Sequence, residues 1–279
     1  KENNFVSAEK IYKEVLEESP SHLGGIFNLA TLYAQKKKFG LAKDLFLKAD
    51  NIKPQDPNIN LNLGNIFFET GDFEKALKYF ENLTNIHKNF AIAHFNKGIV
   101  LNNLKKYEKA NESFKRVIEI EPSNLASYNI ISKNLIEISK ANEALFYLKK
   151  SLEIDSNNNI SIKILTELLG SLKISVINEK NKKALEYLFI FLYNKNSINH
   201  NQLFNNAKLF IFDENELDEI RSILKNNTSL LQNQIFKKIY KNKLFLLILQ
   251  KSLLRDKFLE TVLIKIRKEI IFYKDNFEE

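Results

Sequence analysis

The stretch that decides the fold is GNIFFETGDFEKALKYFENL, residues Gly64 to Leu83. Its apolar residues recur at helical spacing before and after the segment Thr70-Gly71-Asp72, which is typical of a turn. The stretch therefore predicts two amphipathic helices joined at Gly71. A single pair of this kind cannot bury its own apolar face, so its stability has to come from stacking on similar pairs.

The same pattern returns every 34 residues along the first part of the chain. Five alanines stand in phase: Ala8, Ala42, Ala76, Ala110 and Ala144. Four residues after each alanine comes a large apolar residue: Tyr12, Phe46, Phe80, Phe114 and Leu148. Twelve residues before an alanine stands a small residue: Ala30, Gly64, Gly98 and Ser132. Small side chains let two helix backbones approach closely, and a proline closes three of the five units, so the period predicts a stack of helix pairs.

The period resembles that of the tetratricopeptide repeat, as do the segments FNLATLY and LNLGNIF of the first helices and FEKALKYF of the second. The resemblance covers residues 1–158, as five units with the first one truncated. It implies an all-α fold, a right-handed superhelical α-solenoid of helix-turn-helix units whose first helices line a concave groove. The position that is often Trp in this family holds Ile26, Asn60, His94 and Tyr128. Lys97 takes a position that is usually Leu, so we expect the fourth unit to pack less tightly or the Lys97 side chain to reach toward solvent.

The period fails after about Ser156. Ala184 follows Ala144 by 40 residues rather than 34, so residues 159–196 are interpreted as a degenerate repeat that caps the stack. Residues 197–279 carry no such period and are interpreted as a C-terminal helical region. Apolar spacing and end signals predict its helices at 200–211, 214–226 with Asp213 as the N-cap, 229–241, 243–253 and 256–274.

The end of the chain is similar to a linker found in some bacterial proteins. Residues 244–272 resemble the segment between a repeat array and a class I S-adenosylmethionine-dependent methyltransferase domain, with the pattern Leu-x-x-hydrophobic-Arg at Leu263 to Arg267. The resemblance implies that a catalytic domain follows Glu279. No glycine-rich loop follows a predicted strand, so no cofactor is expected in the chain itself.

Candidate binding residues lie along the predicted groove. Asn28, Asn62 and Asn96 fall in phase on successive first helices, two positions before a small residue, and are expected to form a ladder on the groove wall. A carboxamide donates and accepts hydrogen bonds, so it can pair with the backbone of an extended peptide. Such a ladder resembles the one in the repeat superhelix of the O-GlcNAc transferases.

Other residues are expected beside this ladder. Apolar pockets are predicted at Phe27, Leu61 and Phe95, and further polar contacts at Thr31, Asn65 and Lys133. The ladder breaks at Ile130, although Asn129 is adjacent to the break. The alternative is that these asparagines belong to the packing pattern of the repeat and bind no ligand.

Other binding and catalytic chemistries find little support in the sequence. A chaperone-type clamp for a terminal carboxylate needs Lys four residues before the Asn, and those positions are Gly24, Asn58 and Ile92. Cysteine is absent, and the four histidines show no metal-ligand spacing: His22, His87, His94 and His200. We therefore expect no metal site and no catalytic site, and we interpret His94 as a packing residue.

The net charge of +8 is spread along the chain. Residues 1–158 carry 22 basic and 20 acidic side chains, and residues 197–279 carry 14 and 11. Nucleic acid is therefore not an expected partner. No apolar run is long enough to span a membrane and no signal region is visible, so a cytoplasmic location is expected. Because residue 1 is Lys rather than Met, we expect the chain to be a fragment.

Two functions remain open at this point. The first is a non-catalytic scaffold whose groove binds a peptide or a partner protein. The second is the substrate-recruiting region of a larger enzyme, a methyltransferase in first place and otherwise a glycosyl- or sulfotransferase, because repeat arrays precede those enzymes too.

Overall fold

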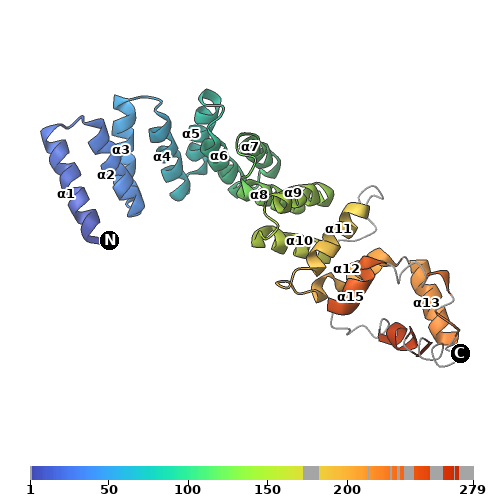
Figure 1. The fold of residues 1–279 in the computed structure, drawn as a ribbon. Coiled ribbons are helices and arrows are strands. Elements are labelled where there is room, and N and C mark those ends of the chain that lie inside the picture. The colour runs from blue at the N-terminus through green and yellow to red at the C-terminus, as the bar shows by residue number, and fades with distance from the viewer. Residues whose placement is uncertain are drawn as a thin grey trace. The chain divides into compact units, whose positions relative to one another are not determined.

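The computed structural model describes residues 2–171, 182–212, 214–226, 228–230, 233–235, 242–251, 260–266 and 268–269. All regular secondary structure in these residues is helical (Figure 1). The chain divides into two compact units, Lys1–Ser139 and Lys140–Glu279. The all-α class expected from the sequence is confirmed.

The first unit is a stack of helix pairs. Its helices are α1 (Glu2–Glu18), α2 (Leu23–Gln35), α3 (Phe39–Ile52), α4 (Pro57–Glu69), α5 (Phe73–Ile86), α6 (Ala91–Asn103), α7 (Tyr107–Ile120) and α8 (Leu125–Glu137). Each helix packs against the next one along the chain, and the first helices of successive pairs also contact one another, α2 with α4 and α4 with α6 (Figure 1). This arrangement is the α-solenoid that the 34-residue period predicts.

The two helices of each pair are joined by a turn of constant geometry. One residue of the turn has a positive φ, and this residue recurs at the repeat interval: Lys37, Gly71, Lys105 and Ser139. At Gly71 φ is 80°, and the following Asp72 donates its backbone N–H to the Phe67 carbonyl at 2.8 Å. The predicted turn at Gly71 is confirmed, and the other repeats build it without glycine.

This turn residue has a predictable effect on stability. We expect Gly71→Ala to lower the free energy of unfolding by about 1 kcal/mol, because a Cβ at positive φ meets the following carbonyl oxygen. Lys105→Gly should raise it by roughly 0.5 kcal/mol, since the same strain is removed at some cost in chain entropy. Urea denaturation measures both changes.

The control for these two variants is Gly40→Ala. Gly40 lies in α3, where no atom comes within 4 Å of an added Cβ. The alanine should therefore stabilise the helix by about 0.5–1 kcal/mol. If Gly40→Ala and Gly71→Ala changed stability in the same direction by the same amount, backbone strain at the turn would not be the cause.

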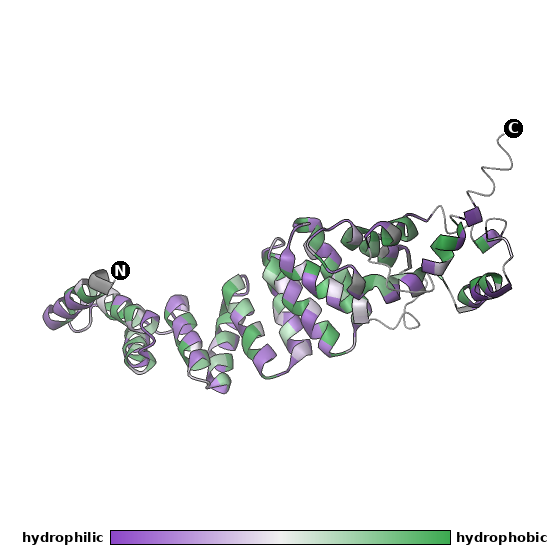
Figure 2. Ribbon diagram, turned by 90° about the horizontal axis from the view of Figure 1, so that it is seen from below, coloured by the Kyte–Doolittle hydropathy of each residue, from purple (hydrophilic) through white to green (hydrophobic). Residues whose placement is uncertain are grey.

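Aromatic side chains of the second helices fill the core of the first unit. Phe46 and Phe114 are fully buried, and Phe80 is 1% exposed. The Phe80 ring lies on the backbone of Gly64 in its own repeat, where an added Cβ would be 2.6 Å from Cε1. Figure 2 shows hydrophobic and hydrophilic residues alternating along the helices, as expected where one helix face is buried. The small residue and the aromatic residue of the repeat therefore form a single contact.

The second unit contains α9 (Ala141–Ile154), α10 (Asn159–Ser171), α11 (Lys182–Tyr193), α12 (Asn201–Ile211), α13 (Glu214–Asn226) and α15 (Lys243–Lys251). Its helices do not pack only in chain order, because α10 contacts α12, and both α11 and α12 contact α15. Phe212 and Phe245 meet edge to face with their ring centroids 5.9 Å apart. The C-terminal helices thus use one another to bury their apolar faces.

The expected element boundaries in this region hold in part. Helices α12 and α13 match the expected segments 200–211 and 214–226 to within one residue, and α15 begins where the helix at 243–253 was expected. Asp213 and many residues of the helices expected at 229–241 and 256–274 lie outside the described residues. The fifth expected repeat is divided, with α8 in the first unit and α9 in the second. The domain boundaries expected after residues 158 and 196 stay predictions.

Candidate functional site

Two asparagines join neighbouring first helices at the predicted groove. Asn96 of α6 donates a side-chain N–H to Oδ1 of Asn65 in α4 at 2.8 Å. Both side chains are half-buried. The contact links α4 to α6 and brings together two residues that the sequence assigned to the groove.

Asn62 and Asn28 occupy the same repeat position as Asn96, on α4 and α2. Asn62 is half-buried and donates to the Asn58 carbonyl of its own helix at 2.8 Å. This bond uses one amide hydrogen, so the second hydrogen and the carbonyl oxygen of Asn62 can still serve a ligand. Asn28 is exposed. The three predicted ladder residues are therefore held in three different ways.

Asn28 and Thr31 line a shallow hollow of about 260 Å³ between α1 and α2. The α1 side of this hollow is apolar, with Phe5, Ala8 and Tyr12. The Thr31 hydroxyl donates to the Phe27 carbonyl at 2.9 Å, which fixes its rotamer on the helix. The hollow therefore combines an amide, a hydroxyl oxygen and an aromatic wall.

The three apolar residues predicted beside the ladder are half-buried. The Phe27 ring meets Phe46 edge to face at 5.5 Å, and the Phe95 ring meets Phe114 in the same way at 5.4 Å. Leu61 packs against the core cluster that contains Phe80. Each of these side chains thus has one part in the core and one part at the surface.

The row of asparagines at the groove, Asn28, Asn62 and Asn96, does not continue into α8. Asn129 is only 4% exposed, so its amide lies inside the protein and does not share the surface of Asn96. Lys133 of α8 is exposed. The contact between α7 and α8 includes a buried polar pair, in which Asn134 donates to Oδ1 of Asn111 at 2.9 Å. We therefore assign Asn129 to the protein interior and not to the groove surface.

Two residues that depart from the family pattern behave as their chemistry predicts. The Lys97 side chain is 24% exposed and its Nζ lies 4.0 Å from Oε1 of Glu81, so it reaches toward solvent as expected. The Nε2 atom of His94 lies 3.0 Å from the Lys88 carbonyl. Burial lowers the pKa of His94, and the neighbouring cations Arg116 and Lys97 act in the same direction.

One polar residue near the groove was missed in the sequence. Asn102 of α6 is half-buried, and its Oδ1 atom is buried without a hydrogen-bond partner among the described residues. Leaving an amide acceptor unsatisfied costs free energy. The sequence does contain a signal for Asn102, because it lies two helical turns beyond Phe95 on the same helix and so shares the face of Phe95.

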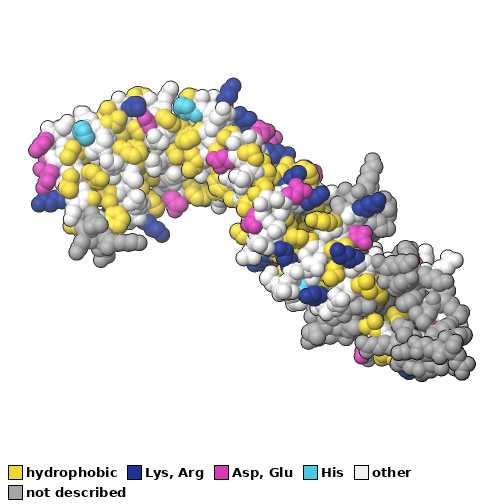
Figure 3. All heavy atoms as spheres, viewed as in Figure 1, with side chains coloured by type: hydrophobic (Ala, Val, Ile, Leu, Met, Phe, Trp, Pro, Cys, Tyr) yellow, Lys and Arg dark blue, Asp and Glu magenta, His cyan; other side chains and the backbone are white. Residues whose placement is uncertain are grey.

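Charged groups of both signs are mixed on the face of the first unit seen in Figure 3. No group of three or more His, Asp or Glu residues in the described part of the chain could hold a metal ion. Within the same residues, no helix combines the length and apolar character that crossing a bilayer requires.

The chain was compared with known protein families. Residues 24–56, 57–89 and 91–124 each match a family model described as tetratricopeptide repeat. These three segments comprise α2 to α7, the part of the first unit that carries the asparagine row. The expected tetratricopeptide repeats are therefore confirmed in these three segments, and the first and fifth of the five expected units stay predictions.

Curated relatives share only part of their length with this chain. A peroxisomal targeting signal receptor of Saccharomyces cerevisiae is 30% identical over 122 residues, 42% of this chain and 20% of the relative. The Hsp70-Hsp90 organising protein of Plasmodium falciparum is 32% identical over 38% of this chain and 20% of its own. The protein O-mannosyl-transferase TMTC3 of Homo sapiens is 21% identical over 77% of this chain and 25% of its own. The chain thus spans about a fifth to a quarter of these relatives.

Solved structures share the fold of the repeats. The crystal structure of MamA protein is 22% identical, with a TM-score of 0.52 over 56% of this chain and 85% of that one. YrrB, described as a TPR protein with an unusual peptide-binding site, is 22% identical, with a TM-score of 0.51 over 58% of this chain and 83% of its own. These similarities establish the solenoid fold. The methyltransferase-linker resemblance of residues 244–272 gains no support from the comparisons.

Proposed function

We propose that the chain is a protein-interaction module that binds an extended segment of a partner protein along α2, α4 and α6. The hydrogen bond between Asn96 and Asn65 carries the proposal, because it joins amide groups of two neighbouring first helices, α4 and α6. Amide groups in a row can pair with a peptide backbone whatever its side chains are. The relatives named as a targeting signal receptor and as an organising protein support a function in protein binding.

The partly exposed apolar residues extend this proposal to ligand side chains. Phe27, Leu61 and Phe95 stand next to the row at the repeat interval. An extended peptide places alternate side chains on one side, so apolar residues of the ligand would meet these three in succession. Lys133 is exposed on the following first helix and would favour an acidic end of the ligand.

The test uses peptides selected from a displayed random-peptide library on this protein. We expect Asn28→Ala, Asn62→Ala and Asn96→Ala together to weaken binding of the selected peptides about tenfold. A hydrogen bond contributes about 0.5–1.5 kcal/mol net, so three bonds at the low end of this range sum to about 1.5 kcal/mol, and 1.4 kcal/mol corresponds to tenfold in the dissociation constant. Fluorescence anisotropy of labelled peptides measures the loss.

The matched control is the pair Asn51→Ala and Glu112→Ala. These residues are exposed on the second helices α3 and α7, outside the proposed row, and should leave peptide binding unchanged. Circular dichroism verifies that both sets remain folded. Peptides whose binding is lost in the control pair and kept in the triple variant would contradict the groove proposal.

A second candidate function is the recruitment of substrates to a transferase. It is supported by the similarity to the protein O-mannosyl-transferase TMTC3, which extends over 77% of this chain. In this case too the groove would bind a protein segment, so the residues under test are the same. Sequencing the gene beyond Glu279 decides between the two, since a strand followed by a glycine-rich turn would favour the transferase.

A further inference from the structure

A larger hollow lies on the other side of the repeats. It has a volume of about 820 Å³ and is lined by residues of α3, of α4 and of α5, with the loop between α3 and α4 at its edge. The α4 residues in it are Asn60 and Phe67. Successive residues of a helix are turned by about 100°, so Asn62 and Asn65 point roughly 140–160° away from Asn60. We call this site the α3–α5 hollow, and it is separate from the groove.

The next repeat shows what fills the corresponding space there. Arg116 stands 34 residues after Asn82, a residue of the α3–α5 hollow. Its guanidinium donates to Oδ1 of Asn89 at 2.9 Å and to Oε2 of Glu119 at 2.6 Å, and its Nε donates to the Lys88 carbonyl at 3.4 Å. The Arg116 side chain therefore reaches from α7 to the loop between α5 and α6.

The groups that hold Arg116 have counterparts in the α3–α5 hollow. Pro54, Gln55 and Asn85 stand 34 residues before Lys88, Asn89 and Glu119, and all three line the hollow. Each offers a carbonyl oxygen, on its main chain or its side chain. The acceptors for a guanidinium are thus repeated, whereas the arginine itself is replaced by the shorter Asn82.

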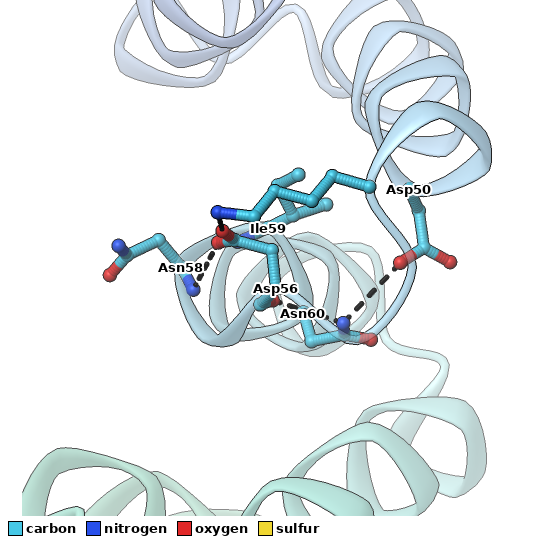
Figure 4. Close-up of polar contacts among 6 residues, drawn as sticks. Asp50, Asp56, Asn58, Ile59 and Asn60 are labelled. Carbon is cyan, nitrogen blue, oxygen red and sulfur yellow. Dashed lines mark hydrogen bonds and ion pairs between the residues drawn. The ribbon is translucent and has the colours of Figure 1, made fainter. Parts of the chain in front are cut away.

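A second substitution enlarges the space. The imidazole of His94 reaches the Lys88 carbonyl in the next repeat, while the corresponding Asn60 is shorter. Asn60 donates instead to the Asp56 carbonyl at 3.0 Å and to Oδ1 of Asp50 at 3.4 Å (Figure 4). These two bonds hold the Asn60 side chain against Asp50 and Asp56, so it does not extend into the hollow.

The walls suit a planar cation. The rings of Phe67 and Tyr79 are stacked at 5.4 Å with an angle of 18° between their planes, and guanidinium groups pack well on aromatic faces. Burial raises the pKa of the Tyr79 hydroxyl, and the charge of Asp50 raises it further, so the phenol stays neutral and the carboxylate lies near it. Asp50 thus supplies a negative charge at the aromatic wall.

The hollow is lined by charged residues of both signs, but some of them already have an ionic partner. Of the two cations, Lys75 is bound to Asp72 at 2.7 Å, with its ammonium 5.4 Å from the centre of the Phe67 ring. Lys78 is exposed at the rim. Of the two carboxylates, Glu81 lies 4.0 Å from Lys97, and Asp50 is half-buried beside the neutral amide of Asn60. The half-buried charge in the hollow, that of Asp50, is therefore negative.

From these observations we propose that the α3–α5 hollow binds an arginine side chain of a partner protein. The guanidinium lies against the Phe67 and Tyr79 rings and donates to Asp50 and to the carbonyl groups of the α3–α4 loop. It takes the place that Arg116 fills within the chain in the next repeat. The partner at this site can be a different protein from the ligand of the groove.

The test uses three matched peptides: acetyl-Gly-Gly-Arg-Gly-Gly-amide and its analogues with Lys or Glu in the middle. Binding is followed through the side-chain amide resonances of Asn60 and Gln55 in isotope-labelled protein. We expect saturable shifts with the arginine peptide, weaker binding of the lysine peptide and no binding of the glutamate peptide. Asn82→Arg should abolish binding, because the introduced side chain fills the hollow from within.

Two more variants separate the charges. Asp50→Asn should weaken arginine binding about tenfold, as expected for loss of a hydrogen bond to a charged group. Lys78→Gln should not weaken it. Preferential binding of the glutamate peptide, lost in Lys78→Gln, would assign the hollow to an acidic partner and overturn the proposal.

The remaining outcomes are also decisive. Saturable shifts that persist in Asn82→Arg would place the arginine elsewhere, and the absence of saturable shifts with all three peptides would refute the site. Asn82 is exposed, so this variant is expected to fold, and circular dichroism verifies it. The triple substitution at Asn28, Asn62 and Asn96 should leave arginine binding unchanged, because those residues lie on the opposite face of the first helices.

Discussion

Phe80→Ala is expected to lower the free energy of unfolding by about 3–5 kcal/mol, because it removes a large buried side chain and leaves a cavity. Phe80 is 1% exposed and packs with Ala76 and Leu83 of α5 and with residues of α6. Its ring also covers Gly64 of α4. One side chain therefore holds together both helices of its repeat and the first helix of the next.

The contact with Gly64 can be tested by coupling two substitutions. In an ordinary helix interior, Gly→Ala stabilises by about 1 kcal/mol. At Gly64 the added Cβ would lie 2.6 Å from Phe80, so we expect Gly64→Ala to destabilise by about 1–2 kcal/mol. Ala30 occupies the corresponding position of the preceding repeat, so the backbone itself accepts a methyl group there. The expected loss of stability in Gly64→Ala therefore comes from the Phe80 ring, which packs where the added methyl group would lie.

Shortening the ring side chain should reverse the sign. In a Phe80→Leu background, Gly64→Ala should be neutral or stabilising, because the leucine side chain ends before the added methyl group. Urea denaturation of the four proteins of this cycle measures the coupling. Additive effects of the two substitutions would mean that Gly64 is required for another reason. Gly98 and Phe114 offer the same test one repeat later, with an added Cβ 2.8 Å from the ring.

The repeat fold was predictable because its physical requirements recur at one interval. A small residue, an alanine and a large apolar residue meet within a unit, so residues of these kinds recur every 34 residues at the positions of Gly64, Ala76 and Phe80. The turn was predicted only where it contains Gly71. Lys37 and Lys105 adopt the same positive φ, but a lysine carries no local signal for it, since the repeat imposes this backbone on whatever residue stands there.

The site was less predictable because it depends on distances between helices. A strict period pairs Asn96 with Asn62, whereas the bonded partner is Asn65, one helical turn further along α4. The offset arises from how neighbouring first helices are displaced along their axes, which the period does not encode. Asn129 lies in the first helix next to the break in the row, yet it is only 4% exposed, and the sequence pattern does not encode that burial.

The α3–α5 hollow was missed because it arises from small side chains rather than from a motif. Asn60 departs from the family pattern, but the consequence of this departure depends on Asn82, which lies 22 residues away on the next helix. Comparing both positions with His94 and Arg116 would have suggested an unfilled space. Whether a neighbouring side chain turns into such a space is decided by packing and not by the sequence pattern.

The second large effect is expected at the buried amide pair of α7 and α8. Asn134 is 2% exposed and Asn111 is 5% exposed, and they share a hydrogen bond of 2.9 Å. Asn134→Leu removes the donor and leaves the Asn111 oxygen buried without a partner. We therefore expect the free energy of unfolding to fall by about 2 kcal/mol, with a similar loss for Asn111→Leu.

Replacing both partners should cost far less than the sum of the single changes. In Asn111→Leu with Asn134→Leu no polar group is left unsatisfied, and two apolar side chains face each other, so we expect stability within about 1 kcal/mol of the original protein. Asn103→Leu is the control, because Asn103 is exposed and donates to the Ile99 carbonyl of its own helix. It should change stability by less than about 0.5 kcal/mol.

The outcome of this cycle separates two roles for the amide pair. If the double variant is as stable as the original protein, the pair adds little net stability, and its role is to select how α7 and α8 pack, since only one register lets the two amides meet. If the double variant loses as much as the two single variants combined, the hydrogen bond itself stabilises the contact and the desolvation argument is wrong. Denaturant unfolding of the four proteins under one set of conditions distinguishes these results.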